Sequence, residues 1–521
     1  MPEYLRAYVI VMALSGIAFV ALNKLRPLPI SKKEYRTWSW LWLCVTSIAF
    51  LAHNYWAFLL LETIIFWIFF PKPVEDRIAT YIFLLPALPV LLNYLSGFGL
   101  VNLLLEMTYP RLLSIVILIP ALFALKRPPG MSRKFPSDKF AFAYFTINAL
   151  LSFRDTSFTG GLRGTVYVFL DEFLPYYVIS RGITSLEHFR KAFSALLASA
   201  FVLAVVGVFE FGKQWLVYEN VYRPLGARHL DFSGYISRRF GSIRISAVFA
   251  HSIVFGYFLV IAFAALNFLK KNFRARSHLL LFGAVMGISL LATFSRGPWV
   301  GFIMFVSVYA VFSPKRSSAV PLLIISIAVV MFMLIIIPGG EKILAFLPFI
   351  GQKDTTGNVS YREILFSAAT AVIQKYPLFG STTYLSEPEL EALRQGQGII
   401  DIVNTYLQIA LDAGLIGVGL FLGVFFSILI GIRRAMKKVK RREEEIYRLG
   451  QTLLAIIVSV LLMIATASKI DFVPYYYWLL AGLGAGYAQM VNSMELRRAQ
   501  NATRTNSQID SERKILSKNK I

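Results

Sequence analysis

Charged residues are scarce in this chain. Only 16% of its 521 residues are Asp, Glu, Lys or Arg, whereas a soluble globular protein carries about 25%. The charges are missing from stretches of roughly 16–22 residues and return between them, as repeated crossings of a hydrocarbon layer about 30 Å thick require. The pattern argues against a soluble protein and predicts an integral membrane protein that crosses its membrane many times.

Cysteine and metal-ligand patterns are equally sparse. The single cysteine, Cys44, excludes an intramolecular disulfide. The run Gly207–Lys213 has the spacing of a phosphate-binding loop, but Gln214 replaces the Ser or Thr that would hold magnesium. No sugar-nucleotide-binding pattern is present, and we expect neither a metal nor a cofactor. The five histidines are scattered without metal-ligand spacing: His53, His188, His229, His251 and His278.

The apolar stretches predict an all-α, polytopic transmembrane protein with about 12–15 spans. We expect transmembrane helices in residues 1–337, with a basic external loop at 212–249, and an external loop with short helices at 338–412. Closing transmembrane helices follow at 413–492, and a basic cytoplasmic tail at 493–521. The expected spans lie near residues 5–23, 38–53, 55–71, 78–95, 110–126, 139–153, 163–180, 190–211, 250–269, 278–294, 297–313, 319–338, 413–432, 450–468 and 473–491.

The net charge of +24 is distributed as an orientation signal rather than as a nucleic-acid-binding surface. Most of the basic residues fall in alternate connections between the expected spans, including Arg433–Arg448 and the tail. The positive-inside rule then places the C-terminus in the cytoplasm and the N-terminus outside. We therefore expect a multi-pass membrane protein with membrane lipids, and no nucleic acid, among its partners.

The two long external connections differ in charge. Gly212–Phe249 is net basic and Pro338–Asp412 is net acidic. Long loops escape the positive-inside bias, so average charge is one interpretation of the basic loop. The other is a site for an anionic group such as pyrophosphate, which arginine holds through paired hydrogen bonds.

Three acidic residues lie inside apolar runs, where ionisable side chains are costly and often functional. They are Glu62, Asp171 and Glu172. For Glu62, lining of a cavity and pairing between helices are the two open interpretations.

The acidic loop contains predicted helices. Ser360–Glu363 fits a capping box, and the helix that follows is stopped by Pro377 and Gly380. A later helix is expected to begin at Asp401, because Asp is a good N-cap and Gly414 lies beyond its end. On that helix Asp401, Asn404, Gln408 and Asp412 would form one polar stripe.

Three external segments, taken in order, resemble the O-antigen ligase and O-antigen polymerase superfamily. They are Ile243–Gly256 at the start of a span, Thr293–Trp299 at a tight turn between spans, and a third region beginning at Tyr361-Arg362-Glu363. The third region continues through Pro377–Gly380 and Asn404–Gln408 to Gly414–Gly417. The resemblance covers roughly residues 139–426.

The resemblance implies a metal-independent glycosyltransferase of a bacterial-type inner membrane that acts on the external face. Its donor would be a glycan linked to a polyprenyl pyrophosphate such as undecaprenyl pyrophosphate. A polymerase passes the glycan to another lipid-linked repeat, as in exopolysaccharide synthesis, and a ligase passes it to a lipid core acceptor. Other polysaccharide assembly proteins are expected partners. A lipid-linked glycan flippase is the rival from another class, although no internal repeat of the kind common in transporters is present.

The resemblance also selects candidate residues. Without a metal, the charge of the departing pyrophosphate must be met by fixed cations, and Arg244, Arg296 and Arg362 stand at matching positions. Snorkelling to lipid headgroups is the alternative role for each arginine. Further substrate-binding candidates are Arg163, Arg239, His251, Asn404 and Gln408.

One departure from the family pattern concerns the catalytic base. Ligases typically place a histidine next to the Asn that corresponds to Asn404, but this chain has Val403 there. Asp401, three residues before Asn404, is a carboxylate that can serve as general base. Capping of a helix is its alternative role. The absence of the histidine shifts the prediction from ligase toward polymerase.

Overall fold

The computed structural model describes residues 1–25, 28–97, 99, 102–126, 135–154, 157–228, 238–239, 241–313, 358–394, 400–439 and 443–518. The expected span at 319–338 lies outside these residues. Helices dominate the described chain, and the strands form two short antiparallel hairpins.

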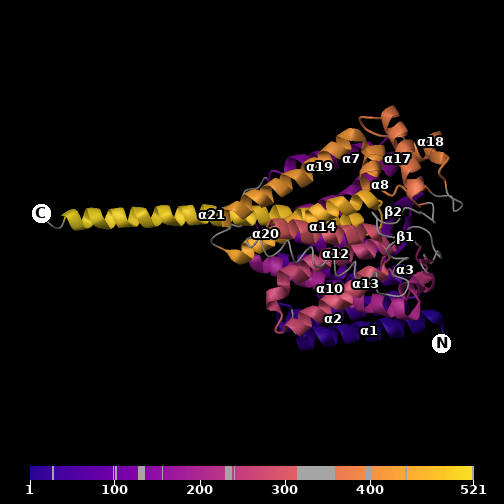
Figure 1. Ribbon diagram of the computed structural model, residues 1–521, viewed down its shortest axis with the longest axis horizontal. Helices are drawn as coiled ribbons and strands as arrows, with labels where there is room; N and C mark the ends of the chain where they lie inside the picture. Colours follow the sequence, from indigo (N-terminus) through magenta and orange to yellow (C-terminus); the bar gives the residue numbers. More distant parts are fainter. Residues whose placement is uncertain are drawn as a thin grey trace.

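The first part of the chain crosses the bundle, with α1 and α2 at one edge and α7 beside α19 (Thr405–Val439) at the opposite edge (Figure 1). Its elements are α1 (Glu3–Leu25), α2 (Lys32–Leu51), α3 (Tyr55–Ile68), α4 (Val74–Leu84), β1 (Leu92–Ser96), β2 (Leu103–Thr108), α5 (Tyr109–Leu113), the π-helical turn η1 (Ser114–Leu118), α6 (Ile119–Ala124), α7 (Asp138–Leu151), α8 (Phe158–Tyr167), the π-helical turn η2 (Val168–Phe173) and α9 (Leu174–Gly182).

The rest of the chain supplies the central and closing helices. Its elements are α10 (Leu186–Lys213), the 3₁₀ turn η3 (Tyr218–Val221), α11 (Tyr222–Leu225), β3 (Arg238–Arg239), β4 (Ser242–Ile243), α12 (Ser252–Leu269), the 3₁₀ turn η4 (Lys270–Asn272), α13 (Arg276–Ala292), α14 (Arg296–Val311), α17 (Asn358–Lys375), the 3₁₀ turn η5 (Tyr384–Ser386), α18 (Pro388–Glu391), α19 (Thr405–Val439), α20 (Glu444–Met463), the 3₁₀ turn η6 (Ile464–Thr466) and α21 (Val473–Lys518).

Five of the described helices are long and apolar enough to cross a membrane, namely α1, α10, α12 with the turn η4, α19, and α20 with the turn η6. Shorter apolar helices, among them α3, α13 and α14, pack with them. Helices α10 and α12 are almost entirely buried, so they form the centre of the bundle. The predicted polytopic helical membrane fold is confirmed.

The expected span at 78–95 is wrong in its second half. Helix α4 ends at Leu84, because Pro86 and Pro89 follow and cannot continue a helix. The chain then forms the β1–β2 hairpin, in which Leu92 pairs with Thr108. The Tyr55 hydroxyl donates hydrogen bonds to the carbonyls of Leu91 and Met107, and so ties the hairpin to the start of α3.

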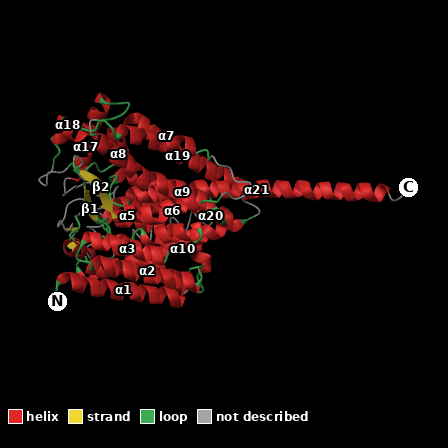
Figure 2. Cartoon of the chain, turned by 180° about the vertical axis from the view of Figure 1, so that it is seen from behind, coloured by secondary structure: helices red, strands yellow, loops and turns green. Residues whose placement is uncertain are grey.

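The two ends of the bundle carry different parts of the chain. The N-terminus, the β1–β2 hairpin, α17 and α18 lie at one end (Figure 1). Helix α21, 46 residues long, projects from the opposite end and carries the C-terminal residues away from the body (Figure 2). The N-terminus and the α17–α18 segment therefore lie at the same end of the bundle.

Two glycines join the α17–α18 segment to the bundle. Gly414 interrupts α19 with φ +68° and ψ −172°, and a Cβ there would overlap the Leu378 carbonyl. Gly380 also has a positive φ, and its Cβ would overlap the Leu411 carbonyl. A side chain at either position would push the two backbone segments apart. The glycines therefore allow Leu415 N–H to donate to the Pro377 carbonyl at 2.8 Å.

Candidate functional site

The short turn between α13 and α14 is a meeting point for arginine side chains. Arg244 donates from Nε to the Thr293 carbonyl at 3.1 Å and from Nη2 to Ser295 Oγ at 2.7 Å. Arg239 donates from Nη1 to the Phe294 carbonyl at 3.3 Å. Arg296 follows directly as the first residue of α14. Three of the predicted arginines are therefore brought together at one turn.

The electrostatics of this turn favour an anion. Burial, followed by repulsion from the Arg239 guanidinium, lowers the pKa of Arg244 to about 9. A lowered pKa means that the surroundings disfavour the cation. A phosphate group bound beside Arg244 and Arg239 would relieve this penalty and form charge-assisted hydrogen bonds with their planar guanidinium groups.

His251 and Asp401 lie within electrostatic reach of each other. His251 directly precedes α12, at its N-terminal end. Burial lowers the pKa of His251; the Asp401 carboxylate opposes this shift, and the Arg244 charge adds to it. The imidazole is therefore neutral at pH 7, between a cationic turn and a carboxylate.

Asp401 does not begin a helix, contrary to prediction. Helix α19 begins at Thr405, and Asn404 is its cap: the Asn404 Oδ1 accepts hydrogen bonds from the N–H groups of Tyr406 at 2.9 Å and Leu407 at 3.2 Å. Asn and Asp cap helices about equally well, so the later residue could take the role. This leaves the Asp401 side chain available for other contacts.

The connection between α20 and α21 organises the site, and the sequence analysis missed it. We call residues 467–472 the closing loop. Ser468 Oγ donates to Asp401 Oδ1 at 2.7 Å, and Lys469 N–H donates to Gln408 Oε1 at 2.8 Å. Asp471 Oδ2 accepts a hydrogen bond from Ala250 N–H at 3.1 Å. The loop thus joins the segment before α12 to the start of α19. Its one sequence signal is a polar run, Ser468–Asp471, between two apolar stretches.

A buried ion pair holds the closing loop from behind. Lys469 Nζ lies 2.7 Å from Glu172 Oε1, and the Glu172 side chain is only 6% exposed. Glu172 belongs to the π-helical turn η2. Glu172 is therefore paired in the structure.

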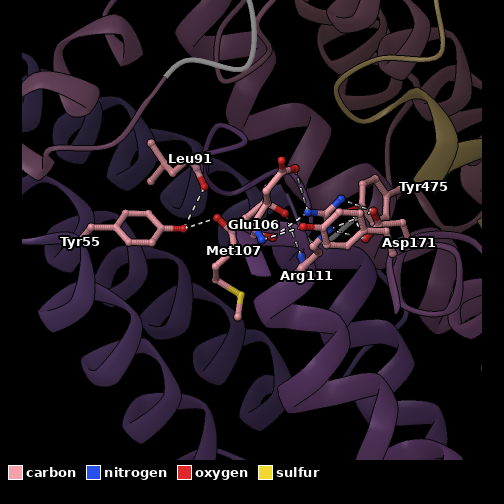
Figure 3. A network of polar contacts seen from close by, with 9 residues as sticks. Tyr55, Leu91, Glu106, Met107, Arg111, Asp171 and Tyr475 are labelled. Carbon is pink, nitrogen blue, oxygen red and sulfur yellow. Dashed lines mark hydrogen bonds and ion pairs between the residues drawn. The ribbon is translucent and has the colours of Figure 1, made fainter. Parts of the chain in front are cut away.

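A second network fixes the neighbouring helices (Figure 3). Arg111 donates to both carboxylate oxygens of Asp171, with Nη2–Oδ2 at 2.8 Å, and its guanidinium stacks 3.6 Å from the centre of the Tyr167 ring. Tyr475, near the start of α21, donates to Asp171 Oδ1 at 2.7 Å. Asp171 is paired as well. Glu62 differs, because it is fully buried and neither carboxylate oxygen has a hydrogen-bond partner among the described residues.

The last two predicted arginines lie apart from the turn. Arg362 is exposed on α17, next to Tyr361, whose hydroxyl donates to the Asp401 carbonyl at 3.1 Å. Arg163 donates to the Leu103 carbonyl of β2. The described contacts therefore place Tyr361, the neighbour of Arg362 in sequence, against Asp401 and tie Arg163 to the hairpin.

Backbone strain concentrates in the same segments. Ala247, Phe294 and Asp471 have φ values of +49°, +46° and +54°, which residues with a Cβ rarely adopt. One lies before α12, one in the arginine turn and one in the closing loop. Strained residues persist where the surrounding contacts hold them, commonly at functional sites.

Fold and site together define a polytopic helical membrane protein with arginines, a histidine and a carboxylate gathered between loops at the ends of its helices. Residues 279–422 match the family model described as O-Antigen ligase. The match confirms the resemblance to the O-antigen ligase and polymerase superfamily and supports a glycan-handling membrane enzyme. It covers the arginine turn, α17 and the first half of α19. No curated protein matches the chain.

Proposed function

We propose that this protein polymerises oligosaccharide repeat units linked to a polyprenyl pyrophosphate, at the external face of the inner membrane. The observation that carries the proposal is the convergence of Arg239, Arg244 and Arg296 on the turn at residues 293–296. Such a cluster suits a donor whose leaving group is a pyrophosphate.

The proposed reaction is a displacement at the anomeric carbon of the donor glycan. The bond from this carbon to the pyrophosphate oxygen breaks, and the departing oxygens gain negative charge that the arginines stabilise. The attacking hydroxyl of the acceptor forms the new glycosidic bond and gives its proton to Asp401. Fixed cations meet the charge in this proposal, so the reaction is metal-independent. Arg362 and Gln408 would orient the substrates.

Transfer to a lipid core acceptor is the second candidate, favoured by the description of the matching family. Purified protein in vesicles that contain only lipid-linked repeat units distinguishes the two. A polymerase lengthens the glycan without any core lipid, as measured by a ladder of products on a gel. Failure to elongate, with efficient transfer once core lipid is added, would make the protein a ligase.

The proposed orientation places the N-terminus and α17–α18 outside, and the last turns of α19 in the cytoplasm. Single cysteines at three exposed positions, Glu3→Cys, Ser386→Cys and Lys437→Cys, test it in a Cys44→Ala background. We expect an impermeant thiol reagent to label the first two in intact cells and the third only after permeabilisation. Labelling of Lys437→Cys alone would reverse the orientation.

A further inference from the structure

A groove of about 560 Å³ lies between α1 and α2. It is lined by the last turns of α1 and the first turns of α2, at the edge of the bundle (Figure 1). This is the end from which α21 projects, opposite the N-terminus and the α17–α18 segment (Figure 2).

The charged residues that line the groove are all cations: Lys32, Lys33 and Arg36. Glu34, the acidic residue between Lys33 and Arg36 in the sequence, forms its contacts outside the groove. Its carboxylate accepts a hydrogen bond from Ser31 N–H at 2.8 Å, within a capping box, and forms an ion pair with Lys191 Nζ of α10 at 2.5 Å. Glu34 therefore does not line the groove, and the cations face an open, positive mouth.

The rest of the lining is mostly apolar and aromatic, with Asn23 and Ser39 as its polar members. Trp40, 57% exposed, and Leu43 continue the groove along α2 toward the middle of the membrane. Tyr35 closes its floor, because its hydroxyl donates to the Phe19 carbonyl of α1. Phe19 of α1 packs edge-on against two rings of α2, with ring centres 6.5 Å from Tyr35 and 6.4 Å from Trp42, and these contacts hold the two walls together.

We infer that this groove binds an anionic phospholipid. Its phosphate would lie among Lys32, Lys33 and Arg36, and one acyl chain would follow Trp40 and Leu43. Basic pockets between transmembrane helices on the cytoplasmic side suit anionic headgroups, and each cation near the surface favours such a lipid. Tryptophan and tyrosine at the same level match the membrane interface. A free phosphate would leave the apolar length of the groove unused.

Native mass spectrometry of the full-length protein, released from detergent with added phosphatidylglycerol, tests the inference. The test variant is Lys32→Gln/Lys33→Gln/Arg36→Gln. The control, Arg433→Gln/Arg434→Gln/Lys437→Gln, removes the same charge from exposed positions on α19. We expect wild type and control to retain one phosphatidylglycerol that the test variant loses, with about a fivefold weaker affinity for each groove cation removed.

Three outcomes would overturn the inference. Phosphatidylcholine retained as well as phosphatidylglycerol would remove the role of headgroup charge. Equal loss in the control would show that overall charge, not the groove, holds the lipid. Displacement of the bound lipid by inorganic phosphate would assign the cations to a free anion instead. Thermal unfolding of wild type, test variant and control in detergent checks folding, and matching curves show that all three proteins are folded.

Discussion

Ser468 donates a 2.7 Å hydrogen bond to Asp401 across 67 residues of chain. The contact joins the closing loop to the segment before α19, and it fixes one carboxylate oxygen of the proposed base. The other oxygen remains to face a substrate hydroxyl. Since Asn404 caps α19, loss of a helix cap no longer accounts for any effect of changing Asp401.

Asp401→Asn should reduce polymerisation by about a hundredfold or more, because an amide cannot accept the proton of the acceptor hydroxyl. The folded fraction should stay near wild type. Ser468→Ala should cost about tenfold through loss of a hydrogen bond to a charged group. Turnover of lipid-linked repeats measures both effects. Glu363→Gln, on the exposed face of α17, is the matched control, and wild-type turnover in Asp401→Asn would remove this residue from the mechanism.

The arginines at the turn should be essential for chemistry. Arg244→Ala and Arg296→Ala should each lose about 3 kcal/mol of transition-state stabilisation, roughly a hundredfold in rate. Lysine should rescue poorly, because a point charge does not reproduce the paired hydrogen bonds of guanidinium. Arg394→Lys in the exposed α17–α18 segment should leave the rate unchanged. Full activity of Arg296→Ala at normal protein level would contradict the proposed site.

Asn404 should act mainly through the helix. Asn404→Ala should lower the free energy of unfolding by about 1 kcal/mol, whereas Asn404→Ser should preserve it, because serine also accepts the N–H hydrogen bonds. Thermal unfolding in detergent measures the difference. A folded but inactive Asn404→Ser protein would instead indicate that the amide contacts substrate, as the family resemblance implies.

His251 predicts a pH dependence of stability. Its pKa is lowered in the folded protein, whereas the unfolded chain titrates near about 6.5. Below that pH the unfolded state binds more protons, so stability falls as the pH decreases through about 6.5. The loss should be smaller in His251→Asn. Unfolding temperatures measured above and below this pH provide the test, and an equal pH dependence in both proteins would refute it.

The network of Arg111 should be structural. Arg111→Ala leaves Asp171 as a buried, uncompensated charge and should destabilise the protein by about 3–5 kcal/mol. Replacing both partners, in Arg111→Met/Asp171→Leu, should recover much of that loss. Denaturation of the single and double variants measures the coupling. Equal instability of the double variant would show that the pair is needed for more than neutralising charge.

The sequence predicts the membrane fold well, because long uncharged runs have few alternatives. It also identifies Arg244 and Arg296, which lie in recognisable segments at helix ends. The start of α19 could not be decided locally, since Asp401 and Asn404 are comparable caps. The partners of Asp401 and Gln408 in the closing loop were equally hidden, because they depend on how distant helices pack. The β1–β2 hairpin was missed because its apolar residues continue the preceding run.

Backbone carbonyl oxygens hold several arginines of this protein: those of Thr293 and Phe294 hold Arg244 and Arg239 at the turn, and those of Phe379, Gly380 and Asp412 hold Arg154. Every amino acid supplies that atom. The arginines therefore depend on the path of the chain at positions 293 and 294 rather than on the side chains there. Those side chains have contacts of their own, since Thr293 Oγ1 donates to the Leu290 carbonyl and the Phe294 ring lies 6.2 Å from the Phe211 ring. A substitution at either position that keeps the backbone path should leave Arg244 and Arg239 in place.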